Sequence, residues 1–410
     1  MLAVIYFLFI TVAVSVLVGL WQKSTNALCK SKRNLQGRTV IVTGGTSGMG
    51  LRIATDFASR GAKVIVACPF IEEGTQGRKH IIERTENEKV IFKLLDLSSL
   101  ASIRKFANEI LESEDRLDIL VNNAGIGIGF DFLTKDGMHC LMQVNYFGTF
   151  LLTLLLLPLL LKTGKPGEPA RIVNTSSILH IVGVVNFNRL NAINYWYGIQ
   201  CYGNSKLCLV LFARELTKRL NNKSVVINSV DPGAVGTTIF NCVGWFFGSI
   251  ITFFFKNLFK TPWEGAQTAI HVALDKRAGE VSGEFFKNCR QTRAKQAAYD
   301  DKTAGKLWEE SVRLVKMDTD EVEQLELRGG GGAGRQGVRG LYAAEIKVPA
   351  KVAQSLLLFC QGQGQLTSLP PPGVERRMSR AMSMEEYDKP NIRRLSLTPN
   401  VSESPPQRKL

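Results

Sequence analysis

Metal-binding patterns are missing from this sequence of 410 residues. None of its eight cysteines belongs to a Cys-x-x-Cys pair, and no cluster of cysteine with any of the four histidines has the spacing of metal ligands. The common structural zinc sites are therefore excluded, and we expect no metal. Scattered cysteines in a chain of this size favour a reducing compartment. Because the histidines show no partner pattern, we expect packed or surface side chains at His80, His139, His180 and His271.

Motifs for nucleic-acid recognition are missing as well. The formal net charge is +15, but no zinc-finger spacing, basic helix or ribbon of aromatic and basic residues accompanies it. A basic balance can also indicate an anionic membrane surface or an anionic cofactor as partner. Much of the excess lies beside the N-terminal apolar stretch and in the C-terminal tail, which favours a membrane-facing protein. We expect no nucleic acid; salt-dependent binding by the isolated C-terminal tail would support that alternative.

Charged residues are absent from residues 2–21, and no basic residue precedes this apolar segment. About 20 residues at ~1.5 Å per residue cross a ~30 Å hydrocarbon core, so we expect a transmembrane anchor. The basic residues that follow predict a single-pass protein with a cytosolic body: Lys23, Lys30, Lys32 and Arg33. The endoplasmic reticulum is the membrane that we expect. A cleaved signal peptide is the alternative, although it would begin with basic residues and have a shorter apolar core.

From residue 36 to residue 320, β-rich runs alternate with helical stretches. The alternation predicts one α/β catalytic domain with a doubly wound parallel sheet, the Rossmann fold, covered by helices on both faces. The runs lack period-two alternation, as is typical of strands buried on both sides. A leucine-rich stretch at 150–161 continues a helix that starts near Asp136, and we expect a core helix there. The expected strands are residues 39–42, 63–67, 90–95, 117–122, 171–174 and 224–229.

Two later segments depart from this alternation. Residues 240–259 are rich in aromatic side chains, and we expect a flexible apolar flap there, with a second membrane span as the alternative. The flap ends at Thr261-Pro262-Trp263-Glu264, a sequence typical of a helix start, with Thr at the cap, Pro in the first turn and Glu three residues after the cap. Residues 328–410 are rich in Gly, Ser, Pro and basic residues, and we expect a disordered low-complexity tail.

A glycine-rich turn separates the first expected strand from the first helix, with the sequence Thr43-Gly44-Gly45-Thr46-Ser47-Gly48-Met49-Gly50. In this context Gly44 permits a tight turn, Gly48 lets the backbone approach a pyrophosphate, and Gly50 lets the helix pack close to the sheet. The N–H groups and the dipole of the helix then favour an anion at its N-terminus. The pattern predicts a dinucleotide site.

An acid is missing from the end of the second expected strand, where residues 67–69 are Ala-Cys-Pro. A carboxylate there would bind the ribose 2′-hydroxyl of NAD(H) and repel the 2′-phosphate of NADP(H). No acid occurs before Glu72, and three basic residues lie nearby in the sequence: Arg52, Arg78 and Lys79. We therefore favour NADP(H) over NAD(H) as the cofactor.

Polar patterns follow two of the later strands. Asn122-Asn123-Ala124-Gly125 follows the fourth strand, and Ser177 follows the fifth, before a helix that carries Tyr202 and Lys206. Because the carboxyl ends of parallel strands meet at one edge of a sheet, these residues face one crevice. The spacing of four residues places Tyr202 and Lys206 on the same face of their helix.

Together these patterns resemble the short-chain dehydrogenase/reductase family over residues 37–317, and the resemblance extends to Asp96, Asn145 and Asp231-Pro232-Gly233 through Thr237. The spacing of 25 residues between Ser177 and Tyr202 (202 minus 177) is similar to that of the retinol dehydrogenase branch. The run at 261–266 is similar to the X-linked dehydrogenase/reductase branch, which implies polyprenoid substrates. The retinol dehydrogenase branch usually has Cys-Arg after the second strand, where this chain has Cys68-Pro69.

The resemblance implies a catalytic role for Asn145, Ser177, Tyr202 and Lys206. Tyr202 would exchange a proton with the substrate, because a nearby ammonium and a cationic nicotinamide lower the pKa of a phenol from about 10. Ser177 would stabilise charge on the substrate oxygen, and Asn145 would hold a water that links Lys206 to solvent. The residues implied to bind the cofactor are Gly44, Thr46, Ser47, Gly48, Met49, Gly50, Asp96, Leu97, Asn123, Ala124, Gly125, Tyr202, Lys206, Pro232, Gly233 and Thr237.

The sequence therefore predicts a membrane-anchored oxidoreductase that transfers a hydride between NADP(H) and a lipophilic alcohol or carbonyl compound. The anchor and the flap favour a retinoid-, polyprenoid- or steroid-like substrate drawn from the bilayer, and we also consider a homodimer. A non-catalytic, cofactor-binding membrane scaffold is the alternative. The intact set of Ser177, Tyr202 and Lys206 argues against it.

Overall fold

The computed structural model describes residues 24–193, 198–220, 224–235 and 260–317, together with positions 6, 10, 13, 17 and 19. Apart from those five positions, the predicted membrane anchor lies outside the described residues. The predicted aromatic flap at 240–259, Thr237 and the low-complexity tail lie outside them as well.

One eight-stranded sheet forms the centre of the described fold, with the strand order β3-β2-β1-β4-β5-β6-β7-β8. Neighbouring strands run parallel except β7 and β8, which are antiparallel. The six predicted strands are confirmed, with ends that move by at most two residues. The strands are β1 (Thr39–Thr43), β2 (Lys63–Cys68), β3 (Val90–Leu94), β4 (Ile119–Asn122), β5 (Ala170–Thr175), β6 (Val225–Asp231), β7 (Phe285–Lys287) and β8 (Arg290–Thr292).

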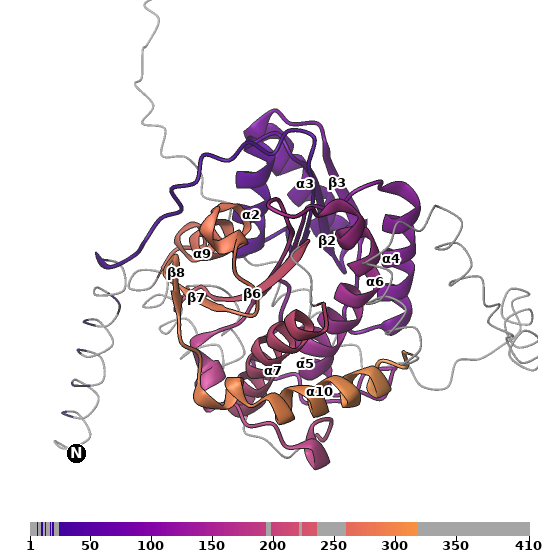
Figure 1. Cartoon of the computed structure of the whole chain (residues 1–410), viewed down its shortest axis with the longest axis vertical. Helices are drawn as coiled ribbons and strands as arrows, with labels where there is room; N and C mark the ends of the chain where they lie inside the picture. Colours follow the sequence, from indigo (N-terminus) through magenta and orange to yellow (C-terminus); the bar gives the residue numbers. More distant parts are fainter. Residues whose placement is uncertain are drawn as a thin grey trace, which may run out of the picture.

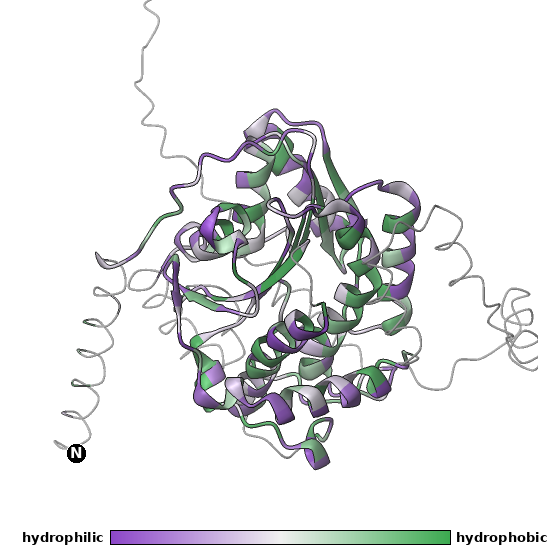
Figure 2. Cartoon of the chain, viewed as in Figure 1, coloured by the Kyte–Doolittle hydropathy of each residue, from purple (hydrophilic) through white to green (hydrophobic). Residues whose placement is uncertain are grey.

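Helices cover both faces of the sheet, so the predicted doubly wound arrangement is confirmed (Figure 1). One face carries α2 (Gly48–Ser59), α3 (Ile71–Thr85) and α9 (Pro262–Leu274), and the other carries α4 (Leu100–Ser113), α6 (Gly148–Thr163) and α7 (Gly198–Leu220). A further helix, α10 (Asp301–Leu314), packs on α7. Each face has its own apolar core, and every residue of β1, β5 and β6 is buried between them. The parallel strands in the middle of the sheet are accordingly mostly green in Figure 2.

The leucine-rich helix is a core helix, as predicted, but it begins later than expected. It starts at α5 (Cys140–Met142), passes through a π-helical turn η1 (Gln143–Phe147) and continues as α6. Gly137 has a φ of +76°, a left-handed conformation that a right-handed helix cannot contain, so a start near Asp136 was wrong. Among the described residues, the stretch Cys140–Thr163 is the one helix long and apolar enough to cross a membrane. Because 89% of its most apolar window is buried inside the protein, it is a core helix here.

The predicted helix start at Thr261 is confirmed, and it begins α9. The Thr261 hydroxyl accepts a hydrogen bond from Glu264 N at 3.2 Å, and the Glu264 carboxylate accepts one from Thr261 N at 2.8 Å. Each side chain thus satisfies a backbone N–H that the helix leaves unpaired, in a capping box. The box fixes the start of α9 directly after Lys260, which forms a parallel bridge with Val235, a few residues beyond the end of β6.

Candidate active site

The glycine-rich turn joins β1 to α2 at the carboxyl edge of the sheet. Gly44 and Gly48 have φ values of +62° and +51°, which favour glycine. A Cβ on Gly50 would lie 1.9 Å from Gly44 O, so no side chain fits where α2 crosses the turn. Ser47 makes no side-chain cap on α2, and the first turn of α2 contains no acid. This cradle suits the close approach of an anion to the helix N-terminus.

Asn123 ties this turn to the end of β4. Its side-chain Nδ2 donates to Thr43 O at 3.2 Å and to Gly44 O at 3.4 Å. The backbone N–H groups of Asn123 and Ala124 both donate to the Thr43 hydroxyl at 3.0 Å. The predicted cofactor residues of the two segments therefore form one surface, in which the Asn123 side chain supports the turn from behind.

Asp96 follows β3 at the same edge of the sheet. Its Oδ1 accepts hydrogen bonds from Ser98 N at 2.8 Å and from the Ser98 hydroxyl at 2.6 Å. The next residue, Leu97, is buried in the core. The described contacts of this carboxylate thus shape the turn that leads into α4, beside the place predicted for the adenine ring.

Tyr202 and Lys206 lie one turn apart on α7, as their spacing predicted. Lys206 is buried, and its Nζ donates to Thr175 O at 3.0 Å and lies 5.4 Å from the centre of the Tyr202 ring. Burial lowers the pKa of Lys206 to about 8. Burial raises the pKa of Tyr202 well above its usual value, a hydrogen bond with Ser177 lowers it, and the charge of Asp231 raises it further. The phenol is therefore protonated unless a cation approaches it.

Asn145 lies on the π-helical turn, close to Lys206. Its Oδ1 accepts a hydrogen bond from Ile126 N at 2.8 Å, and its Nδ2 donates to Ile126 O at 3.0 Å and to the Ser205 hydroxyl at 3.2 Å. A Cβ on Gly125 would lie 3.2 Å from Asn145 Oδ1 and 3.4 Å from Lys206 Nζ. Gly125 therefore leaves a narrow space between the two side chains. π-Helical turns often mark functional sites, because the extra residue re-aims a side chain.

Ser177 precedes a short 3₁₀ helix, η2 (Ile178–Val182), and is held by His180. His180 Nδ1 lies 2.7 Å from Ser177 O, while its Nε2 accepts a hydrogen bond from Lys295 N at 3.0 Å. An Nε2 that accepts requires the neutral ring with its proton on Nδ1, which then donates to Ser177 O. Burial lowers the pKa of His180 and favours that neutral form. From the sequence we expected an ordinary packed or surface histidine at His180. Its spacing of three residues from Ser177 was the one available signal.

Asp231 connects Ser177 to the Pro232-Gly233 turn. It is fully buried at the end of β6, and its Oδ1 accepts hydrogen bonds from Ile178 N at 3.1 Å and Gly233 N at 2.9 Å. Gly233 has a φ of +85°, so the turn depends on glycine. Lys287 Nζ lies 3.5 Å from the second oxygen, Oδ2. The motif gave Asp231 no role of its own, whereas the structure makes its carboxylate the link between two parts of the site.

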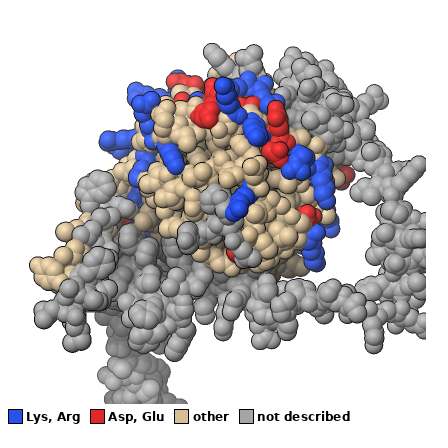
Figure 3. All heavy atoms as spheres, turned by 90° about the horizontal axis from the view of Figure 1, so that it is seen from below, with Lys and Arg blue, Asp and Glu red and all other residues tan. Residues whose placement is uncertain are grey.

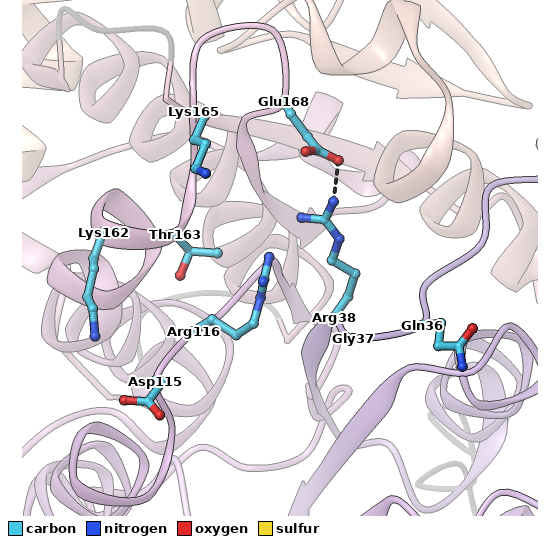
Figure 4. A pocket seen from close by; sticks show the side chains of 9 residues that line it. All are labelled: Gln36, Gly37, Arg38, Asp115, Arg116, Lys162, Thr163, Lys165 and Glu168. Atoms are coloured by element: carbon cyan, nitrogen blue, oxygen red, sulfur yellow. Dashed lines mark hydrogen bonds and ion pairs between the residues drawn. The ribbon is translucent and has the colours of Figure 1, made fainter.

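A separate pocket of about 480 Å³ lies at the opposite, amino edge of the sheet (Figure 4). Arg38 there bonds Asp118 at 2.9 Å and Glu168 at 2.5 Å, and Arg116 bonds Asp118 at 2.7 Å. These charges neutralise one another at the starts of β1, β4 and β5, so we assign the pocket a structural role. Seen from below, lysine and arginine side chains, with aspartate and glutamate among them, lie along the upper border and the two sides of a mostly uncharged area (Figure 3). The pocket is lined by Gln36, Gly37, Arg38, Asp115, Arg116, Lys162, Thr163, Lys165 and Glu168.

Comparison with known proteins agrees with this geometry. The sequence model of the family described as short chain dehydrogenase matches residues 38–243. The chain is 38% identical over 308 residues to retinol dehydrogenase 13 of Homo sapiens, which covers 74% of this chain and 92% of that protein. It is 39% identical over 297 residues to dehydrogenase/reductase SDR family member 13 of Bos taurus, with 72% and 77% covered. A solved structure of an uncharacterized protein from Mycobacterium Paratuberculosis is 28% identical and superposes with a TM-score of 0.56, covering 70% of this chain and 96% of that one.

Proposed function

This chain belongs to the short-chain dehydrogenase family and is an oxidoreductase of that family, and from this premise we propose that it interconverts a lipophilic alcohol and the corresponding carbonyl compound with a nicotinamide dinucleotide. One observation carries the proposal. Ser177, Tyr202 and Lys206 converge at the carboxyl edge of the sheet, where the glycine-rich turn also lies. Ligands of open parallel sheets bind at that edge, next to the point between β1 and β4 where the strand order reverses.

The residues of the cradle fit the dinucleotide. A Cβ would collide with backbone at Gly50 and approach Ala124 closely at Gly44, so only glycine lets the turn pack this tightly at the start of α2, where backbone N–H groups favour an anion. We assign the pyrophosphate to the turn at 44–50 and the nicotinamide end to Tyr202, Lys206 and the Pro232-Gly233 turn, with Thr237 as predicted from the sequence. When bound, the dinucleotide supplies or accepts the hydride. The sequence favours NADP(H) as the form that binds.

Tyr202 is the proposed general acid and base. In the reductive direction its phenol donates a proton to the carbonyl oxygen of the substrate, and in the oxidative direction the phenolate accepts the proton of the alcohol. Lys206, near the Tyr202 ring, favours the phenolate through its positive charge. Ser177 donates a hydrogen bond to the same substrate oxygen and stabilises its developing charge. Asn145 is proposed to hold a water that connects Lys206 to solvent.

A lipophilic substrate is supported by the surface around the catalytic pair. Large apolar side chains are exposed in the segment between Ser177 and Tyr202, and exposed apolar patches mark binding sites for apolar ligands or membranes. Relatives named retinol dehydrogenase suggest a retinoid-like alcohol, with polyprenoid and steroid carbonyls as further members of the class. The exposed side chains are Ile178, Ile181, Val182, Val184, Ile193 and Ile199.

We propose that residues 2–21 anchor the enzyme in the endoplasmic reticulum membrane, with the domain at 36–320 in the cytosol and the tail at 328–410 following it. Carbonate extraction of the full chain and of a chain without residues 2–21 tests the anchor. We expect only the full chain to stay with the membrane fraction. Light scattering of the detergent-solubilised protein tests the homodimer.

Turnover by the full-length, detergent-solubilised protein tests the function. NADPH and NADH are offered with retinal, a polyprenal and a steroid ketone, and Tyr202→Phe is measured beside the wild type. We expect wild-type turnover with at least one pair and a loss of about 10²–10⁴-fold in Tyr202→Phe, the usual contribution of a general acid or base. Tyr146→Phe is the matched control, because it also removes a buried phenol bonded to a serine, Ser311 at 2.8 Å, but lies in the core.

Two outcomes would contradict the proposal. Equal turnover by wild type and Tyr202→Phe would remove Tyr202 from the chemistry. Tight dinucleotide binding without turnover of any carbonyl compound would favour the non-catalytic scaffold.

A further inference from the structure

Glu73, on the first turn of α3, reaches back to the glycine-rich turn. The Thr46 hydroxyl donates a hydrogen bond to Glu73 Oε1 at 2.8 Å, and Thr46 is buried. The second carboxylate oxygen, Oε2, is also buried, and it has no hydrogen-bond partner among the described residues. Leaving a carboxylate oxygen buried without a donor is costly, so this atom is suited to accept a hydrogen bond from a ligand.

This carboxylate lies at the adenosine end of the nucleotide site. Gly44 N donates to Ala67 O at 2.7 Å, so the turn starts against the end of β2. A Cβ on Gly77 would lie 2.9 Å from the Thr46 Cα, which means that α3 packs directly against the turn. The end of the second strand is where this fold meets the ribose that carries either a 2′-hydroxyl or a 2′-phosphate. Glu73 thus brings a negative charge to that place from the following helix.

The basic residues that lie close to the end of β2 in the sequence do not provide a cluster of positive charge at the ribose; each lies near other groups. Arg78 Nε donates to Val90 O at 2.8 Å, at the start of β3 and hence at the opposite edge of the sheet. Lys79 Nζ lies 3.7 Å from Glu83 Oε1, one turn further along α3. Arg52 lies near His80, in the middle of α3, where its charge lowers the pKa of that ring after the larger effect of burial. At the strand end itself, Pro69 has no side-chain donor.

We propose that Glu73 makes the enzyme select a dinucleotide with a free 2′-hydroxyl, so that it binds NAD(H) more tightly than NADP(H). The proposal rests on the dinucleotide site of the proposed function, and it replaces the preference for NADP(H) that the sequence favoured. A carboxylate accepts a hydrogen bond from a hydroxyl group, whereas it repels a phosphate dianion in the same position. The sequence could not show this, because the acid lies five residues beyond Cys68, the last residue of β2, and only the fold of α3 returns it to the turn.

Direct binding tests the proposal without relying on catalysis. Full-length protein in detergent is titrated with NADH and with NADPH, and the two dissociation constants are read from the fluorescence of the bound nicotinamide. We expect NADH to bind at least about tenfold more tightly than NADPH. Glu73→Gln keeps the shape and removes the charge, so the ratio should fall by about tenfold. The neighbouring exposed acid provides the control, Glu72→Gln, which should leave the ratio unchanged.

The possible outcomes distinguish a failure of the proposed NAD(H) selection from a failure of the proposed oxidoreductase function. NADPH binding as tight as NADH in the wild type would overturn the selection, and so would an unchanged ratio in a folded Glu73→Gln protein. Arg52→Gln provides a second test, because a selective loss of NADPH affinity would place the 2′-phosphate on Arg52 and overturn the role of Glu73. Failure of the folded wild type to bind either dinucleotide would instead overturn the proposed function itself.

Discussion

Replacing Lys206 by methionine is expected to stabilise the protein near neutral pH while it abolishes activity. Lys206 is only 3% exposed, and burial lowers its pKa from 10.5 to about 8. At about 1.4 kcal/mol per pH unit, the charged ammonium is therefore about 3 kcal/mol less favourable in the folded protein than in the unfolded chain. Methionine has a similar length and no charge, so Lys206→Met removes that cost.

The pH dependence follows from the order of the two pKa values. Below about pH 8 the lysine is charged in both states, and the full cost is present. Between that pH and 10.5 the unfolded chain keeps a proton that the folded protein has released, so this group makes wild-type stability rise with pH. The neutral amine still bonds Thr175 O at 3.0 Å, a contact worth about 1 kcal/mol that methionine cannot make. Lys206→Met should thus be about 2 kcal/mol more stable than the wild type at pH 7 and about equally stable at pH 10, where most of the unfolded lysine is still protonated.

Urea unfolding of both full-length proteins in detergent, followed by tryptophan fluorescence at pH 7 and pH 10, measures this effect. The difference between variant and wild type cancels the other groups that titrate in the same range. Lys79→Met, at an exposed lysine, is the control and should show no pH-dependent difference. A Lys206→Met protein that is less stable than wild type at pH 7, or a difference that is the same at both pH values, would refute the reasoning.

Three further changes probe other parts of the structure. Gly50→Ala places a Cβ 1.9 Å from Gly44 O, so we expect a loss of about 1–3 kcal/mol in urea unfolding and weaker dinucleotide binding by fluorescence titration; unchanged affinity would contradict the cradle. Asp231→Asn removes a charge that raises the Tyr202 pKa, so the acid limb of the pH profile for alcohol oxidation should move to lower pH, and an unmoved limb would exclude the coupling. Thr261→Ala removes the cap on α9 and should lower the free energy of unfolding by about 0.5–2 kcal/mol. An unchanged free energy of unfolding would show that the capping box does not stabilise the protein.

Much of the fold could be predicted from local pattern. Apolar runs without alternation predicted the six parallel strands, because each strand is buried on both faces. The missing strands, β7 and β8, have three residues each, too few to give a period. The late start of the leucine-rich helix depended on the backbone of Gly137, which composition does not reveal.

The site residues likewise fall into those that a local pattern predicts and those that only the folded chain reveals. Tyr202, Lys206 and the glycine-rich turn were predictable because each pattern is contiguous and has a chemical reason for its spacing. Glu73 and His180 were not, since their partners are distant in the chain: Thr46 is 27 positions from Glu73, and Lys295 is 115 positions from His180. Contacts of this kind arise only when helices and strands pack, and a single sequence carries no periodic signal for them.

The contact between His180 and Lys295 shows that the site depends on a segment beyond the motifs by which the family is recognised. The family match ends at residue 243, and every motif that identifies the chemistry precedes it. Yet the amide that fixes the ring of His180, and through it the backbone of Ser177, comes from the segment after β8. A shortened product that stops at residue 243 would thus retain each of these motif residues but lose the contact that orients the His180 ring against the Ser177 carbonyl. Such a product would still be recognised as a dehydrogenase by its sequence. The part of the chain that the family match covers is thus smaller than the part needed for a complete site.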